Sequence, residues 1–254
     1  MSFITIGFAF LIIVLFTVFV RRGMRWGAAP EEVTMRMTGD TYLKNGPSAR
    51  TAMTRAVSID APPETVWLWL AQLGRGAGWY SVDWLDNGGK TSARHIVTWI
   101  PAPELGDATA IGYLRHIEPG RELTWWTDGV RFFGARARLV TDILLRPEGG
   151  GSRLVIRMSA DTTGFTARLA IWAFQIIDTI MGKRQILGIK QRVERFGART
   201  SDPERAETGE RDQFQLYEII YASGERAGVP GKESAERWRQ AAAKDLFIHE
   251  SADI

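Results

Sequence analysis

The stretch "SIDAPPETVWLWLAQLGRGAGWYSVDWLDN", residues 58–87, contains the signals for the end of a strand, a helix and a loop. The strand comes from "RAVSIDA" (55–61), in which apolar and polar residues alternate. Pro62 and Pro63 end this strand, and proline is tolerated in the first helical turn, so a helix is predicted from here to Gly74. Four of the chain's ten tryptophans fall in this stretch: Trp67, Trp69, Trp79 and Trp84. So much rigid aromatic surface serves a core, a ligand pocket, or a face for a membrane or partner, and the flanking sequence has to distinguish these.

The sequence after this loop predicts an antiparallel meander followed by one long helix. Strand-like runs occupy residues 112–119, 121–128, 135–148 and 152–163. The "PG" and "EGGG" segments between these runs are typical of hairpin turns. The long helix is predicted over 165–197, with an apolar stripe approximated by Leu169, Ala173, Ile176, Ile180, Leu187 and Val193.

This order of elements predicts an α+β fold in which a curved antiparallel sheet wraps around the long C-terminal helix. The inner face of the sheet would present Leu139, Ile143, Leu154, Ile156 and Met158, and the helix would present Ile176 and Ile180. Sheet and helix enclose a cavity unless side chains fill it, and small-molecule pockets of roughly 300–1,000 Å³ are mostly apolar. The alternative is a core packed to ordinary density, with the tryptophans as filler.

A run of 18 uncharged residues, "FITIGFAFLIIVLFTVFV" (3–20), precedes this body. At 1.5 Å per residue it spans about 27 Å, close to the hydrocarbon thickness of a bilayer. Arg21, Arg22 and Arg25 follow it, so the positive-inside rule places the body in the cytoplasm (at the inner membrane in a bacterium), and Trp26 falls where an interfacial aromatic would. A cleaved signal peptide would have its bases before the run and a small-residue site after it. A buried core helix is the remaining alternative.

These signals divide the chain into an N-terminal transmembrane anchor (1–26), a tether (27–52), a sheet-and-helix domain (53–197) and a partly helical, acidic C-terminal tail (198–254). Within the tail, residues 201–254 carry 12 acidic and 7 basic side chains, a net charge of −5. The remaining 25 basic and 17 acidic residues give the rest of the chain a net charge of +8. The basic part includes the apolar run, so we expect a membrane partner, and without a basic run interleaved with aromatics we expect no nucleic acid.

The composition excludes several kinds of site. Cysteine is absent, which excludes disulfides, thiolate metal sites and cysteine nucleophiles. The three histidines show no metal-ligand spacing, so we expect no metal and no cofactor. No phosphate-loop, dinucleotide or serine-hydrolase motif stands between a strand and a helix, and we assign no catalytic residue. Asp83 and Asp86 come closest to an acid–base pair, but beside Asn87 we interpret them as turn and capping residues.

The opening stretch, "LGD" (105–107) and "ILGIKQRVE" (186–194) resemble the START-like superfamily, also called the polyketide cyclase/Bet v 1-like or SRPBCC proteins. The resemblance covers roughly residues 50–197 and implies a helix-grip fold, in which an antiparallel sheet holds a long C-terminal helix around a hydrophobic tunnel. It also implies binding of lipids, sterols, quinones, polyketides or hormones, with cyclisation or dehydration in a minority of members. The apolar run and the tail lie outside the resemblance.

The candidate ligand-binding residues come from the loop, which borders the cavity mouth in a helix-grip fold, and from the strands and the long helix. Adjacent strand residues face opposite sides, and the less polar alternating set favours Trp125 over Trp126 as the inward residue. His116 is either a polar cavity residue or a hydrogen-bonded sheet residue. The full set is Trp69, Trp79, Tyr80, Trp84, Tyr113, His116, Trp125, Ile156, Met158, Ile176 and Ile180.

Phe132 and Phe133 form an apolar tip between Arg131 and Arg136. We interpret this tip as a membrane-interface element, with a tip folded back onto the body or a partner as the alternative. The remaining candidate interface residues are Arg21, Arg22, Arg25 and Trp26.

We therefore expect a membrane-anchored START-like protein that binds a hydrophobic small molecule, such as a lipid or quinone, at the cytoplasmic membrane face without catalysis. One alternative is an accessory or assembly subunit of a larger membrane protein complex. A second is a cyclase- or hydrolase-like enzyme acting on a hydrophobic substrate, which the shortage of candidate acids, bases and nucleophiles disfavours.

Overall fold

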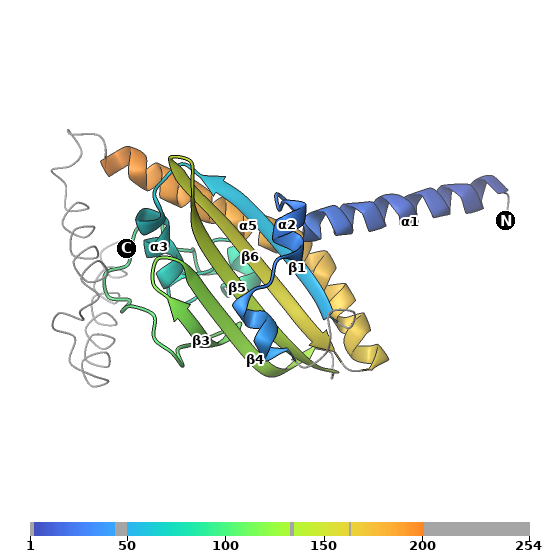
Figure 1. Cartoon of the computed structure of the whole chain (residues 1–254). Helices are drawn as coiled ribbons and strands as arrows, with labels where there is room; N and C mark the ends of the chain where they lie inside the picture. Colours follow the sequence, from blue (N-terminus) through green and yellow to red (C-terminus); the bar gives the residue numbers. More distant parts are fainter. Residues whose placement is uncertain (1–2, 44–49, 133–134, 163, 201–254) are drawn as a thin grey trace, which may run out of the picture.

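One antiparallel sheet of six strands forms the centre of the molecule (Figure 1). The computed structural model describes residues 3–43, 50–132, 135–162 and 164–200. The strands are β1 (Arg50–Ile59), β2 (Ala108–Thr109), β3 (Gly112–Glu118), β4 (Glu122–Phe132), β5 (Ala135–Glu148) and β6 (Gly151–Thr162). Their spatial order is β1-β6-β5-β4-β3-β2, so the predicted meander is confirmed and β1 completes it by pairing with β6.

The helices are α1 (Phe3–Met24), α2 (Pro30–Thr34), α3 (Pro63–Gln72), α4 (Asp83–Asp86) and α5 (Phe165–Thr200), with a 3-10 helix η1 (Thr38–Tyr42). Both α3 and α5 pack on one face of the sheet, and this inner face carries the core. Pro63 stands in the first turn of α3 and Gly74 follows its end with φ +70°, as the sequence predicts. The fold class is therefore α+β, with a long C-terminal helix and an apolar N-terminal helix.

The main core lies between α3, the C-terminal half of α5 and the inner face of the sheet. Trp69 is completely buried there, and its ring meets those of Tyr80 and Phe196 edge-on, with centroids 5.8 and 6.2 Å apart. Trp125 is buried in the same core, so it is the inward residue of its pair, while Trp126 is half-exposed beneath Arg115. Of the four tryptophans in residues 58–87, three are therefore buried core residues and one, Trp84, is exposed; the buried ones are Trp67, Trp69 and Trp79.

The outer face of the sheet is covered by the strap, which we define as residues 27–43. Arg157 reaches the strap from β6 and donates hydrogen bonds to the carbonyls of Val33 and Met35 at 3.0 and 2.7 Å. Arg153, four residues earlier on the same face, pairs with the buried Glu32 at 2.8 Å. These contacts attach the residues that follow α1 to the sheet.

The N-terminal helix α1 leaves the body and projects away from it (Figure 1). Its segment Gly7–Met24 is long and apolar enough to cross a membrane, and most of that segment is exposed. Its C-terminal end crosses α5 at Gly23, where a Cβ atom would lie only 2.0 Å from Thr179 Cγ2. Glycine therefore allows the two helices to approach closely.

The predicted inward stripe of α5 is wrong for the first part of that helix. Leu169 and Ile180 are 53% and 55% exposed, and Leu187 is 37% exposed, whereas Val193 is buried as predicted. The residues that face inward there are mostly small or polar, namely Ala167, Ala170, Gln175 and Asp178, together with one large apolar residue, Ile171. The periodicity indicates that α5 has an apolar stripe, but the stripe does not face the sheet. The opposite side of α5 does, because Asp178 on that side pairs with Arg55 of β1.

Candidate functional site

A cavity of about 310 Å³ lies between α5 and the inner face of the sheet. Strands β5 and β6 contribute most of its apolar wall, through Leu139, Ile143, Ile156 and Met158. Phe174 and Met181 of α5 face these strands, Leu85 comes from α4, and the loops supply Leu73, Trp79, Ala110 and Ile111. Its volume lies at the lower end of the range for small-molecule sites, about 300–1,000 Å³.

A buried ion pair stands in the wall of this cavity. Arg55 Nη1 of β1 lies 2.7 Å from Asp178 Oδ2 of α5, and both side chains are less than a tenth exposed. Arg55 also donates to the carbonyls of Asp178 and Gly23, at 2.9 and 3.0 Å. Burial raises the pKa of Asp178, and the neighbouring Arg55 opposes that rise. The pair gives an otherwise apolar cavity one polar, charged position.

Gly182 makes room for this ion pair. A Cβ atom at Gly182 would lie 2.2 Å from Arg55 Nη1. Because Gly182 sits one helical turn after Asp178, any larger residue would push the guanidinium away from the carboxylate. The polar position therefore depends on three residues that the fold brings together from β1 and α5.

Asp86, at the end of α4, also lines the cavity. Its Oδ1 atom is buried without a hydrogen-bond partner, and burial, with a smaller contribution from Asp83, raises its pKa. Asp83 has a structural role that matches its interpretation as a turn residue, since its Oδ2 accepts a hydrogen bond from Ser92 N at 3.0 Å. Asp86, in contrast, offers an acceptor atom at the cavity wall.

Tyr80 follows Trp79 but points into the core instead of the cavity. Its φ of 58° places it in the left-handed region, which is uncommon for a residue with a side chain. Gln72 Nε2 donates to its hydroxyl at 2.6 Å, and the Arg192 guanidinium lies 4.5 Å from the ring centre. Its carbonyl approaches α5 so closely that a Cβ at Gly188 would lie 2.0 Å from it. Tyr80 thus fixes the loop against α3 and α5 and lets Trp79 line the cavity.

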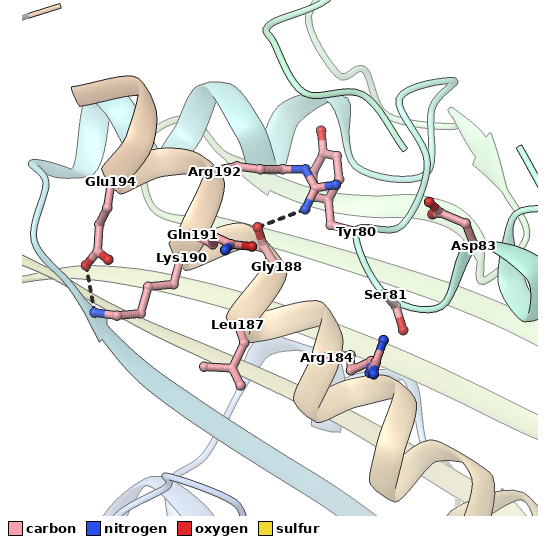
Figure 2. Close-up of a pocket in the computed structure, with 10 residues that line it drawn as sticks. All are labelled: Tyr80, Ser81, Asp83, Arg184, Leu187, Gly188, Lys190, Gln191, Arg192 and Glu194. Atoms are coloured by element: carbon pink, nitrogen blue, oxygen red, sulfur yellow. Dashed lines mark hydrogen bonds and ion pairs between the residues drawn. The ribbon is translucent and has the colours of Figure 1, made fainter. Parts of the chain in front are cut away.

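A second hollow, of about 500 Å³, lies outside the cavity along α5 (Figure 2). Figure 2 shows Arg192 lying against Tyr80 and Lys190 paired with Glu194, at 2.6 Å. Arg192 also donates to the carbonyls of Ala93 and Gly188, at 2.8 and 3.1 Å. Arg192 thus holds the loop against α5, while Lys190 pairs within α5 and donates to the carbonyl of Ser58 in β1 at 2.7 Å. These contacts give the hollow a structural explanation.

The structure brings together only part of the predicted ligand-binding set. Trp79, Ile156 and Met158 line the cavity. Trp69, Tyr80 and Trp125 are buried in the core, while Trp84 and Tyr113 are exposed. His116 is half-buried on β3, and Ile176 and Ile180 lie on the outer side of α5, half-buried and exposed respectively.

Sequence reasoning missed the polar cavity residues Arg55, Asp86 and Asp178. A signal for two of them was present. Arg55 interrupts the alternation of a predicted strand, and Asp178 is the only acidic residue between positions 165 and 193. Single opposite charges in two apolar segments that pack together indicate a buried pair, because an unpaired buried charge is costly.

Among the predicted membrane-interface residues, Arg21, Arg22 and Arg25 are exposed at the end of α1. Trp26 is half-buried between α5 and β1: Lys183 Nζ lies 5.2 Å from its ring centre, and its carbonyl accepts from Ala56 N at 3.1 Å. Phe133 and the side chain of Phe132 lie outside the described residues, as does the predicted helical tail after Thr200.

One group of potential metal ligands is present in the described part of the chain. The ligand atoms of His116, Glu118 and Glu122 all lie within 4.8 Å of one another. Arg121 Nη1 lies 2.9 Å from Glu118 Oε1 and competes for that carboxylate. None of the three lines the cavity, and the ion pair with Arg121 accounts for the exposed side chain of Glu118 without a metal.

No family model and no curated protein matches the chain. Among solved structures, it is similar to protein CV1439 from Chromobacterium violaceum, with 15% identity, a TM-score of 0.37, and 58% of this chain and 98% of that chain covered. It is also similar to MLL2253 from Mesorhizobium loti, with 20% identity, a TM-score of 0.37, and 57% of this chain and 98% of that chain covered. The similarity to NE0264 from Nitrosomonas europaea has 13% identity and a TM-score of 0.39, and covers 61% of this chain and 99% of that chain. These TM-scores lie below 0.5, and we draw no conclusion on fold or function from them.

Proposed function

We propose that this protein is a membrane-anchored START-like protein with a helix-grip fold that binds an amphiphilic small molecule without transforming it. The observation that carries this proposal is the cavity between α5 and the sheet, with its apolar wall and its buried Arg55–Asp178 pair. A cavity lined in this way suits a molecule with an apolar body and a small polar head.

The polar position indicates how the head would bind. Arg55 presents donors, and Asp86 Oδ1 is a buried acceptor without a partner. A hydroxyl would donate to Asp86 Oδ1, since a buried acceptor without a partner costs about 1–3 kcal/mol. It would accept from a guanidinium N–H of Arg55 that the contacts with Asp178 and Gly23 leave over. The apolar body would then lie against Ile143, Ile156 and Met158.

The anchor belongs to the same proposal. Segment Gly7–Met24 would cross the membrane, with the arginines at its end holding the body on the cytoplasmic side. An apolar ligand concentrates in the bilayer, and a tether keeps the cavity close to that reservoir.

The test is mass spectrometry of molecules extracted from the full-length protein purified in detergent. Met158→Trp fills the cavity, and Tyr113→Trp adds the same ring at an exposed position of β3. We expect one class of small amphiphile in the wild-type protein and in Tyr113→Trp, and its loss in Met158→Trp. Detergent and bulk lipid alone in all three would contradict the proposal, and a stoichiometric membrane protein in their place would favour the accessory-subunit alternative.

A further inference from the structure

The exposed apolar side chains of α5 form a continuous stripe on the side of the helix opposite the cavity. The stripe consists of Phe165, Leu169, Trp172, Ile176 and Ile180, which follow one another at intervals of three or four residues. Four of the five are between 51% and 80% exposed. Residues two apart on a helix point about 200° apart, so Trp172 and Ile176 face away from the cavity residue Phe174 between them. Solvent alone does not explain a stripe of this kind.

The stripe is continuous with the candidate membrane helix. Where α1 crosses α5, a groove of about 710 Å³ is lined by apolar residues of both helices, including Leu15, Phe19, Ile180 and Leu187. Arg22, Lys183 and Arg184 line the same groove. Figure 1 shows that α1 leaves the body on the side where the first turns of α5 lie. A bilayer that receives α1 would therefore approach the stripe.

Apart from one buried carboxylate, the charges of α1 and of α5 up to Leu187 have one sign. Residues 3–25 and 165–187 contain a single carboxylate, Asp178, which is buried and paired with Arg55. The same segments contain six basic residues, all exposed: Arg21, Arg22, Arg25, Arg168, Lys183 and Arg184. An apolar stripe bordered by bases and free of exposed acids matches the acyl chains and head groups of an anionic membrane.

We propose that the first half of α5, residues 165–180, lies in the interface of an anionic bilayer, with its stripe among the upper acyl chains. The proposal rests on the membrane insertion of α1 that is part of the proposed function, but not on occupancy of the cavity. In this arrangement one helix separates the bilayer from the cavity, because Phe174 and Asp178 face inward while Trp172 and Ile176 face the lipid.

The test measures the membrane depth of single positions in the full-length protein. Because the chain has no cysteine, one substitution places one fluorescent nitrobenzoxadiazole (NBD) label. The sites are Leu169→Cys and Trp172→Cys on the stripe, Leu11→Cys in α1 as the embedded reference, and Leu105→Cys as an exposed leucine outside α1 and α5. The protein is reconstituted into vesicles of phosphatidylcholine and phosphatidylglycerol, with and without doxyl-labelled lipid as quencher.

We expect doxyl lipids to quench the label at positions 11, 169 and 172 and to leave position 105 unchanged. If position 11 is quenched while 169 and 172 emit as in water, the stripe faces solvent and the proposal is wrong, although the anchor stands. Blue-shifted emission at 169 and 172 without quenching would mean that a second copy or residues 201–254 cover the stripe, which also overturns it. Loss of quenching at position 11 as well would contradict the anchor itself, whereas the extraction experiment on the cavity is independent of all three.

Charge-reversal variants test whether the basic residues beside the stripe contribute to its contact with an anionic membrane. Lys183→Glu with Arg184→Glu reverses two bases of the groove, and Lys90→Glu with Arg94→Glu reverses two exposed bases elsewhere. In phosphatidylglycerol vesicles we expect the first pair to reduce quenching at position 172 and the second pair to leave it unchanged. Equal quenching in both variants would contradict the role assigned to the basic border.

Discussion

Asp142 holds the strap on the outer face of the sheet through one carboxylate oxygen. Its Oδ1 accepts hydrogen bonds from Gly39 N and from Thr124 Oγ1, both at 2.8 Å. Burial raises its pKa from 3.8 to about 6, with the carboxylates of Glu122 and Asp40 adding to the rise. Between these two values the folded state binds more protons than the unfolded chain, so the free energy of unfolding falls as the pH rises from about 4 to 6.

We predict that Asp142→Asn stabilises the protein at pH 7.5, by up to about 3 kcal/mol, and changes little at pH 4.5, where the wild-type side chain is protonated in the folded state. An asparagine can still accept both hydrogen bonds through its own Oδ1. The measurement is the thermal midpoint of the detergent-solubilised protein at both pH values. Asp142→Ala removes the acceptor and should lower the thermal midpoint at both pH values. If the thermal midpoint of Asp142→Asn equals that of the wild type at both pH values, the raised pKa of Asp142 is wrong.

Glu32 has the opposite pH dependence. The hydrogen bond from Arg153 lowers its pKa despite its burial, so its contribution is present above about 4.5 and is lost as the pH falls through the folded-state value. Glu32→Ala should lower the free energy of unfolding by about 3 kcal/mol at pH 7, because it leaves Arg153 without its main partner. Glu31→Ala, at an exposed neighbouring position, should change it by less than about 0.5 kcal/mol. If Glu32→Ala and Glu31→Ala lower the free energy of unfolding equally in denaturant melts, Glu32 does not hold the strap to the sheet.

Individual side-chain directions in the aromatic loop could be predicted only in part. Trp79 lines the cavity as expected of a loop tryptophan, but the adjacent Tyr80 turns into the core. That turn depends on a left-handed backbone conformation that glycine usually adopts, and "GAGWYS" gives no sign that a tyrosine would adopt it. The neighbouring Asn87 makes Asp86 resemble a turn or capping residue, and its cavity neighbours on α5 lie about ninety positions further along the chain, so no local pattern indicates its place in the cavity wall.

The crossing of α1 and α5 depends on Gly23. We predict that Gly23→Val separates the two helices, because a side chain there meets Thr179 Cγ2, while Gly7→Val, with no atom near its Cβ, has no such effect. Hydrogen exchange of the full-length protein measures this as faster exchange over residues 20–28 in Gly23→Val only. Unchanged exchange would contradict the packing of α1 on α5.

At the scale of elements, the order and limits of the main strands and helices followed from alternation and from proline and glycine. The predicted strand at 135–148 coincides with β5, and the predicted helix at 165–197 with most of α5. The direction of the α5 stripe did not follow, since periodicity gives the existence of an apolar side but not what covers it. The residues of α5 that face the sheet, such as Ala167, Ala170 and Gln175, lie outside the predicted stripe.

The molecule carries the apolar helix α1 on one side of the body, and its positive charge is concentrated outside residues 201–254. We predict that the body lies in the cytoplasm. Protease added to intact cells or right-side-out vesicles should leave it uncut, and protease added to inverted vesicles should digest it. Digestion from the outer side would reverse the orientation and with it the assignment of Arg21, Arg22 and Arg25 to the cytoplasmic interface.

On the proposed function, the cavity between α5 and the sheet holds a small molecule in the cell. Site-specific photocrosslinking tests it most directly, with p-benzoylphenylalanine in place of Phe174 at the cavity wall and, as control, in place of the exposed Trp84. After irradiation of cells that express the full-length protein, the intact mass of the purified chain is measured. We predict a small-molecule adduct at position 174 and none at position 84; an unmodified chain at position 174, or a crosslink there to another protein, would contradict the claim.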